Sequence, residues 1–318
     1  MGYQQALADV AAALTEVNDL HDAFVIATTK LQDVTAKLQD ITAQVTPPPP
    51  PPPPPPSPPP PTEDPRLVAL QAQIGADKVG VYTGIETFND APAAFAEIAS
   101  TLQAYGADFA LVKMGEGSAT WHNGDFASIR QAFFAHGLGC APYWYCLPQG
   151  GQAQIDACIH LAQQFKLLIL DCEDEYAGHD AELADLLNAL AVAAPSALII
   201  VSGYGDPITR FGPHGWPFHT VATAAKAVYQ PQAYFGVWDV YNQHGVDAAL
   251  QWCDNECAAA FGQAIVLQPA INVQGVKSLA DFEAAGRYWK SFKASVVLWE
   301  YQQVTAQIVA AVKKGLHE

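Results

Sequence analysis

Hydrophobic positions in the first 46 residues follow a helical repeat. Residues 4–46 contain no glycine or proline, and apolar side chains recur at steps of three and four from Leu7 to Val45, with one short step at Leu20. This spacing is typical of a heptad seam, which a single helix cannot bury by itself, and the short step predicts local overwinding. We therefore expect residues 1–46 to form an oligomerising or anchoring coiled-coil helix. The alternative is a helix packed on the rest of the chain.

The next segment is dominated by one residue type. Pro47 to Pro61 are prolines apart from Ser57. Proline has a fixed φ and no amide donor, so the run predicts a polyproline II rod. At about 3.1 Å per residue the rod spans roughly 45 Å. We expect residues 47–65 to be a stiff linker. A docking site for a proline-binding domain is the alternative.

From Val79 onward, β-rich runs alternate with amphipathic helical stretches. The predicted strands are Val79–Thr83, Phe109–Lys113, Cys140–Tyr145, Leu167–Cys172, Leu198–Ser202, Ala227–Gln230, Ile265–Gln268 and Ser295–Trp299. Eight strands that alternate with helices over about 240 residues predict an α/β fold, a closed (β/α)₈ barrel of the TIM type, over residues 66–318. An open, doubly wound sheet is the alternative, but no Gly-rich phosphate loop follows the first strand.

Composition narrows the function. The chain has 15 basic and 32 acidic residues and a net charge of −17, which disfavours nucleic acid as a partner. No apolar run reaches 18 residues, so we expect no membrane span. The N-terminus does not resemble a Sec signal. The six cysteines show no metal-ligand spacing, so we interpret them as buried thiols and expect neither metal nor cofactor.

Candidate chemistry lies where the predicted strands end, because the reactive groups of such barrels gather at the carboxyl ends of the strands. Carboxylates, amides and aromatic rings converge there, and sugars need that mixture. The candidate substrate-binding residues are Tyr82, Lys113, Glu116, Tyr143, Trp144, Tyr204, Gln230, Gln268, Trp299 and Tyr301. The candidate catalytic residues are Asp171, Glu173 and Glu300.

The sharpest signal is LLILDCEDEY. Asp171 and Glu173 are two residues apart and follow an apolar strand, so both side chains should point to the same side. Two close carboxylates that raise each other's pKa can supply a general acid and a charged stabiliser. A solvated acidic loop is the alternative interpretation.

Four motifs in chain order resemble the family 25 glycoside hydrolases, the lysozyme-type muramidases. They are Gly80-Val81, then Lys113, Glu116 and Gly117 in KMGEG, then Asp171 and Glu173 in DCE, and Trp299 with Tyr301 in WEY. The resemblance covers the barrel only. It implies that Glu173 is the proton donor, that Asp171 orients the sugar or stabilises the oxocarbenium-like charge, and that the substrate is peptidoglycan.

The chain departs from that family at the first strand. Where the family carries an Asp, this sequence has GVYTG, with Tyr82 or Thr83 in that place, and Glu300 could supply the missing charge. Two hypotheses therefore stay open. One is a glycosidase that acts on a bacterial wall polymer. The other is a non-catalytic glycan-binding or structural barrel of a phage tail or other assembly. With the coil and rod, either would be displayed in several copies, on a virion or outside the cell without a Sec signal.

Overall fold

The computed structural model describes residues 74–75, 77–83, 92–122, 125–224, 227–262, 269–292, 295–299 and 301–318, together with Lys30. The chain divides into two units, Met1–Pro61 and Thr62–Glu318. Apart from Lys30, the predicted coil and the polyproline linker lie outside the described residues, so both stay predictions. The description below concerns the second unit.

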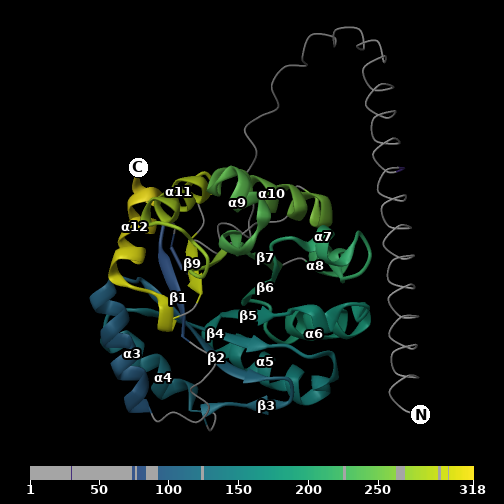
Figure 1. Cartoon of the computed structure of the whole chain (residues 1–318). Helices are drawn as coiled ribbons and strands as arrows, with labels where there is room; N and C mark the ends of the chain where they lie inside the picture. The colour runs from purple at the N-terminus through teal and green to yellow at the C-terminus, as the bar shows by residue number, and fades with distance from the viewer. Residues whose placement is uncertain are drawn as a thin grey trace, which may run out of the picture. The chain divides into compact units, whose positions relative to one another are not determined.

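Eight parallel strands close into a barrel (Figure 1). The first strand, β1, pairs with β2 on one side and with β9 on the other, which leaves no open edge between the first and last strands. This closure confirms the predicted (β/α)₈ barrel and shows that the open-sheet alternative is wrong. The strands are β1 (Val79–Thr83), β2 (Phe109–Glu116), β4 (Gly139–Tyr145), β5 (Leu167–Asp171), β6 (Leu198–Tyr204), β7 (Ala227–Gln232), β8 (Ala270–Asn272) and β9 (Val296–Trp299).

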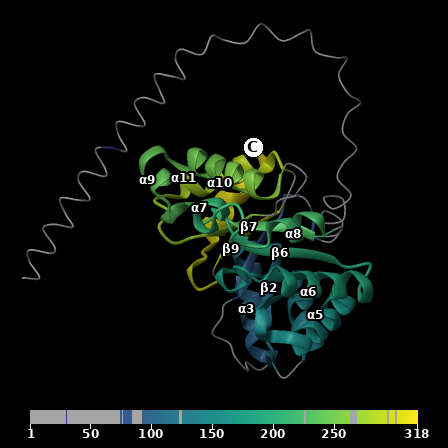
Figure 2. The same cartoon turned by 90° about the vertical axis from the view of Figure 1, so that its right-hand side faces the viewer.

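Helices lie around the outside of the strands in both views (Figures 1 and 2). They are α3 (Pro92–Tyr105), α4 (Phe126–Ala135), α5 (Gly151–Phe165), α6 (Asp180–Ala193), α7 (Pro207–Phe211), α8 (Phe218–Thr223), α9 (Asp239–His244), α10 (Val246–Phe261), α11 (Leu279–Lys290) and α12 (Ala306–His317). Side chains cap the starts of α4, α11 and α12. The Asp125 side chain caps α4, for example, by accepting from the Ser128 amide at 3.2 Å.

Alternation along each strand divides the core into two layers. On β5, Leu167 and Ile169 lie in the cluster inside the barrel, whereas Leu168 and Leu170 lie in the cluster between strands and helices. Successive side chains on a strand point to opposite faces. Asp171 therefore continues the inward series at the carboxyl end of β5. The same alternation of inward and outward side chains applies to every strand whose carboxyl end contributes residues to this end of the barrel.

The predicted elements differ from the observed ones in a few places. β2, β6 and β7 run two or three residues beyond their predicted ends. β2 also turns into a short antiparallel strand, β3 (Ala119–Thr120), which the sequence pattern did not predict. The predicted strand Ile265–Gln268 lies outside the described residues, and the described strand in this part of the chain is β8. The short helices α7, α8 and α9 were also not predicted, because a helix of five or six residues carries too little periodicity.

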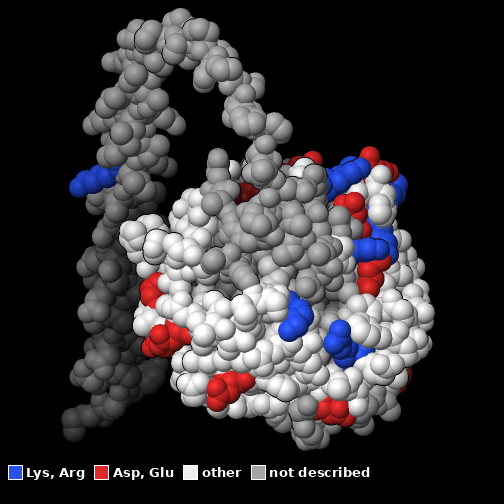
Figure 3. All heavy atoms as spheres, turned by 180° about the vertical axis from the view of Figure 1, so that it is seen from behind, with Lys and Arg blue, Asp and Glu red and all other residues white. Residues whose placement is uncertain are grey.

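Charged side chains on the described part of the rear face are dispersed among uncharged ones, with acidic and basic groups adjacent along one edge (Figure 3). Ion pairs of this kind connect α11 and α12, where Lys314 Nζ lies 2.8 Å from Glu283 Oε2. Within the described residues, no helix is long and apolar enough to cross a membrane.

Candidate functional site

A cavity of about 490 Å³ opens at the carboxyl ends of the strands. Its lining comes from strand ends and from the loops that follow them. The lining residues are Lys113, Glu116, Tyr143, Tyr145, Leu147, Asp171, Glu173, Glu175, Tyr234 and Trp299. Five of these are acidic or basic side chains and four are aromatic, so the cavity combines charged groups with aromatic rings.

Asp171 lies deep in this cavity. Its side chain is inward on β5 and 5 % exposed, and its backbone is held on both sides of the strand end. The Cys146 amide donates to the Asp171 carbonyl at 2.8 Å, and the Cys172 amide donates to the Ser202 carbonyl at 2.9 Å. Burial raises the pKa of Asp171 well above its usual value, and the nearby Glu173 raises it further, whereas Lys113 and hydrogen bonds from Gln232 and Ser202 oppose the rise.

Glu173 lies nearer the rim, beyond the end of β5. Its Oε1 accepts a hydrogen bond from Gln232 Nε2 at 2.7 Å, and its Oε2 accepts one from the Tyr204 hydroxyl at 3.1 Å. The backbone carbonyl of Glu173 accepts from Trp216 Nε1 at 3.1 Å. Burial raises the pKa of Glu173, while the Gln232 and Tyr204 hydrogen bonds lower it. One carboxyl of the pair therefore holds its proton to a higher pH than a free carboxylic acid does.

The two carboxylates are close together. Gln232 Nε2 donates to Asp171 Oδ1 at 3.0 Å as well as to Glu173 Oε1, so these two oxygens can be no farther apart than the sum of the two hydrogen-bond lengths. The two carboxyl groups therefore approach each other across a single amide nitrogen.

Lys113 brings a buried positive charge to one side of the pair. Its side chain is inward on β2, and Nζ lies 2.7 Å from Glu116 Oε2. Nζ also lies 4.3 Å from the centre of the Trp121 ring and 5.0 Å from that of Tyr145. Ion pairing and cation–π contacts compensate the desolvation of the ammonium group. Lys113 is thus the cation whose field favours an ionised Asp171.

Aromatic rings form the floor and one wall. Tyr82 packs edge-on against both Tyr143 and Trp299, with ring centres 5.0 Å apart in each case. The Tyr82 hydroxyl donates to Gln230 Oε1, so the residue at the place of the missing first-strand acid is engaged inside the barrel. On the wall, the Tyr145 hydroxyl donates to Glu175 at 2.9 Å.

Several predicted residues lie elsewhere. Trp144 is fully buried in the layer between strands and helices and donates from Nε1 to the Gly117 carbonyl at 3.1 Å, so it does not face the cavity. Its position follows from parity, because Tyr143 and Tyr145 are the inward residues of β4. Gln230 lies below the cavity, and Tyr301 packs at the edge of the outer layer. Glu300 and Gln268 lie outside the described residues, so their roles stay predictions.

The sequence reasoning missed Gln232, the residue that bridges the pair. The predicted strand ended at Gln230, before Pro231, yet β7 continues through Pro231 to Gln232. Alternation was the signal that could have found it, since Gln230 and Gln232 share the inward face. Glu175 and Tyr234 were also missed. Both follow the ends of strands, where the sequence spacing no longer predicts which way a side chain points.

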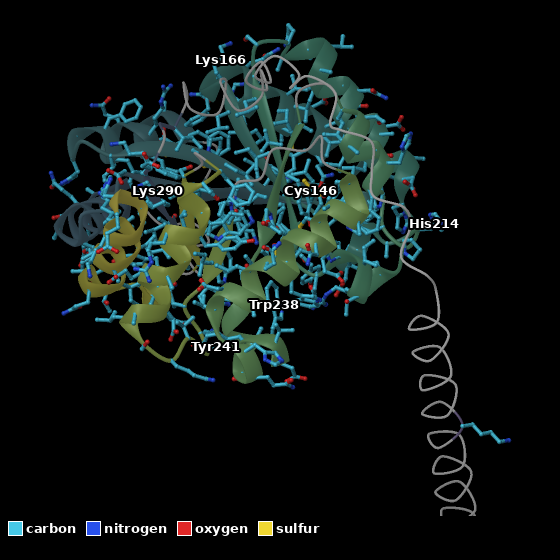
Figure 4. The ribbon with its side chains drawn as sticks, turned by 90° about the horizontal axis from the view of Figure 1, so that it is seen from above. Cys146, Lys166, His214, Trp238, Tyr241 and Lys290 are labelled. Carbon is cyan, nitrogen blue, oxygen red and sulfur yellow. The ribbon has the colours of Figure 1, made fainter. Side chains whose placement is uncertain are left out.

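The thiols are separate from the cavity. Of the six cysteines, five are buried and Cys140 is half-buried, which agrees with the expectation of structural thiols. Seen from above, Cys146 lies inside the outline of the fold, whereas Lys166 and His214 lie at its edge (Figure 4). Among the described residues, no group of three or more His, Cys, Asp or Glu side chains is arranged to hold a metal ion.

Comparisons with known proteins show the fold. No family model matches the chain, and no curated protein matches it by sequence. Among solved structures, it resembles an endo-β-1,4-mannanase from Thermotoga petrophila, with a TM-score of 0.57, 7% identity, and coverage of 78% of this chain and 77% of that one. It also resembles the catalytic domain of a chitinase from Pyrococcus furiosus, with a TM-score of 0.52, 11% identity, and coverage of 76% and 95%.

A third similar structure is the spore cortex-lytic enzyme SleL of Bacillus megaterium, with a TM-score of 0.50, 11% identity, and coverage of 75% and 74%. Larger neighbours are covered less fully. The chain spans 57% of a trimodular endoglucanase and 61% of the tri-modular endo-β-1,4-glucanase B from Bacillus halodurans. At these identities the likeness establishes a barrel shared with glycoside hydrolases, and the chemistry has to be argued from the residues of the site.

Proposed function

We propose that this chain is a glycoside hydrolase that cleaves a bacterial cell-wall glycan of the peptidoglycan type. The observation that carries the proposal is the carboxyl pair Asp171 and Glu173, joined by one amide nitrogen at the mouth of the barrel. Glycosidic cleavage needs a proton donor and a nearby negative charge, and a crowded carboxyl pair provides both.

The roles follow from burial and reach. Glu173 is the more accessible carboxyl and lies at the rim, so it donates its proton to the oxygen of the leaving sugar. We assign the ionised state to Asp171 because Lys113 lies beside it and opposes the rise in pKa that burial causes. In that state Asp171 stabilises the positive charge that develops on the sugar ring. Because the two carboxyl groups accept hydrogen bonds from one amide nitrogen and so lie close together, we expect the anomeric configuration to be retained. Retention would proceed through a covalent adduct or through a neighbouring group of the substrate.

A polymeric substrate is supported by a second hollow beside the first. This hollow, of about 280 Å³, is lined by Glu116, Gly117, Ser118, Ala119, Trp121, Leu147, Gln149 and Gly150. Glu116 and Leu147 line both spaces, so together they form a groove that runs from the carboxyl pair over the β2–β3 turn. Its hydroxyl, amide and aromatic groups suit further sugar units. The wall-glycan assignment rests on the KMGEG, DCE and WEY motifs, and Lys113, Glu116 and Trp299 of these motifs line the cavity with the pair.

The test is a screen for reducing ends released from peptidoglycan, chitin, mannan and β-glucan, with the full-length wild type and Glu173→Gln. We expect release from peptidoglycan and a loss of about 10²–10⁴-fold in the variant, the usual contribution of a general acid. Equal circular dichroism spectra would show that the fold is kept. Release of reducing ends by neither protein, with binding by both, would favour the alternative, a glycan-binding barrel. The replacement of the first-strand acid by Tyr82 and Thr83 is the observation that favours this alternative.

The display role is also a proposal. A coil and a rod would gather several barrels near one surface and raise their effective concentration there. That arrangement would suit a virion component or a hydrolase attached outside the cell. Light scattering on the full chain and on residues 66–318 tests it. A larger mass per particle is expected for the full chain alone, and monomers in both cases would exclude self-association through residues 1–46.

A further inference from the structure

The amide of Gln232 occupies an unusual place between the two carboxyl groups. It is 4 % exposed, at the end of β7, and its single nitrogen donates to Asp171 Oδ1 at 3.0 Å and to Glu173 Oε1 at 2.7 Å. Its own carbonyl oxygen, Oε1, is buried and has no hydrogen-bond partner among the described residues. Both of its N–H donors are used, while its acceptor is left unsatisfied.

This orientation restricts where a proton can be. An amide N–H can only donate, so each oxygen that faces it must act as an acceptor. Asp171 Oδ1 and Glu173 Oε1 therefore cannot carry the proton toward Gln232. The remaining positions for a proton are Asp171 Oδ2 and Glu173 Oε2, and Glu173 Oε2 faces the Tyr204 hydroxyl at 3.1 Å. A hydroxyl can accept from a protonated oxygen as readily as it donates to an ionised one, so Tyr204 is compatible with both states of Glu173.

The reverse orientation of the amide would be unfavourable. It would place Gln232 Oε1 against two carboxyl oxygens, at least one of which is ionised once the pair has lost a proton. Repulsion between these oxygens would exceed the benefit of pairing the orphan carbonyl, because hydrogen bonds to charged groups are the stronger ones. The amide of Gln232 is therefore more stable with its nitrogen, and not its oxygen, facing both carboxyl groups.

We propose that Gln232 is a positioning residue that keeps a proton of the pair off the two oxygens it faces, so that the proton of Glu173 is held on Oε2, the oxygen from which it is delivered to the glycosidic bond. The proposal rests on the proposed glycosidase function of the pair. Gln232 does not take up or release a proton itself. It fixes which oxygen is protonated and holds the two carboxyl groups at one distance.

Other groups around the pair also influence its titration. They come from every element that packs against it, and they are Tyr82 on β1, Lys113 on β2, Tyr145 on β4, Asp174 and Glu175 after β5, Tyr204 on β6 and Tyr234 after β7. None of them contacts both carboxyl groups through one atom in the hydrogen bonds described above. Removing Gln232 alone should therefore change both groups together.

The test is the pH dependence of kcat/KM for Gln232→Met, in the full-length protein. Methionine is close to glutamine in length and removes both donors. Gln232 lowers the pKa of both carboxyl groups, so its loss should raise both. Both limbs of the pH profile should move to higher pH, by about one unit, in keeping with the loss of a hydrogen bond to a charged group. A variant with lower activity but an unmoved profile would overturn the proposal.

The matched control is Gln230→Met, two residues earlier on the same strand and face. Gln230 is equally buried but pairs with Tyr82 rather than with the carboxyl groups. It should change the height of the profile without moving either limb. Gln232→Glu is a second variant of the same size. It adds a negative charge and should move the limbs farther to higher pH than Met does, so wild-type limbs in Gln232→Glu would also contradict the proposal.

A readout without turnover separates this proposal from the proposed function. The side-chain carboxyl carbons of Asp171 and Glu173 can be followed by ¹³C NMR across pH in the wild type and in Gln232→Met. An upward shift of both titrations in a protein without glycosidase activity would support the positioning role and refute the enzymatic one. Unchanged titrations in an active protein would refute the positioning role alone.

Discussion

Carboxylates serve opposite purposes at the two ends of the barrel. At the amino ends of the strands, Asp108 accepts from the Val79 amide at 2.9 Å and lies 2.9 Å from Lys313 Nζ and 3.6 Å from Lys78 Nζ. At the carboxyl ends, Asp171 and Glu173 share one amide donor, and the buried Lys113 is a cation beside Asp171. Asp108 therefore has two lysines and a backbone amide as partners, whereas Asp171 has a second carboxyl group, that of Glu173, close to it. The partners of a carboxylate therefore decide whether it is held as a stable ion pair or has a raised pKa.

The largest expected effect separates the two ends by activity. Asp171→Asn should lower kcat/KM by about 10²–10³-fold, because it removes the charge that stabilises the transition state. Asp108→Ala should leave kcat unchanged and lower the free energy of unfolding by about 1–3 kcal/mol, since it removes a charged hydrogen-bond acceptor. Steady-state kinetics and urea unfolding measure the two quantities. If Asp108→Ala lost activity while keeping its stability, the division between the two ends would be wrong.

The groove predicts a smaller effect on binding. Ala119 is exposed on β3 and lines the second hollow, so Ala119→Trp should fill it. We expect KM for a long glycan to rise about tenfold, as for the loss of one well-fitted contact, with KM for a short aryl glycoside unchanged. Ala191→Trp, at an exposed position of α6, is the matched control for a new surface tryptophan. Equal effects on both substrates would place the groove outside the binding site.

The smallest expected effect concerns stability and its dependence on pH. The pKa of Asp171 is raised in the folded state, so the native protein binds more protons than the unfolded chain between the two pKa values. Stability from this group is therefore present at low pH and is lost as the pH rises through the folded pKa. Asp171→Asn should weaken that loss and raise Tm at pH 8 by about 2–4 °C, with less gain at pH 4. A gain that is equal at both pH values would show that the raised pKa is not its cause.

Much of the barrel could be predicted from the sequence, since strands and helices alternate with clear periodicity from Val79 onward. The side shared by Asp171 and Glu173 also followed from their spacing. Trp144 was assigned to the mouth because all three residues at the end of its strand were taken together, although parity sends only Tyr143 and Tyr145 inward. Gln232 was missed because the predicted strand ended at Gln230, two residues before the end of β7. The groove could not be predicted, because it depends on how the β2–β3 turn meets Leu147 in space.

The alternation of side chains on β5 also affects how the sequence can evolve. On the inward face, Asp171 lines the cavity and Ile169 lies in the core inside the barrel, whereas Leu168 and Leu170 lie in the layer between strands and helices. Substitutions on one face touch different neighbours from those on the other, so their free-energy effects should largely add. Each strand thus behaves as two nearly independent sets of sites. Substitutions that change the cavity can therefore accumulate on one face without a large change in the packing of the other face.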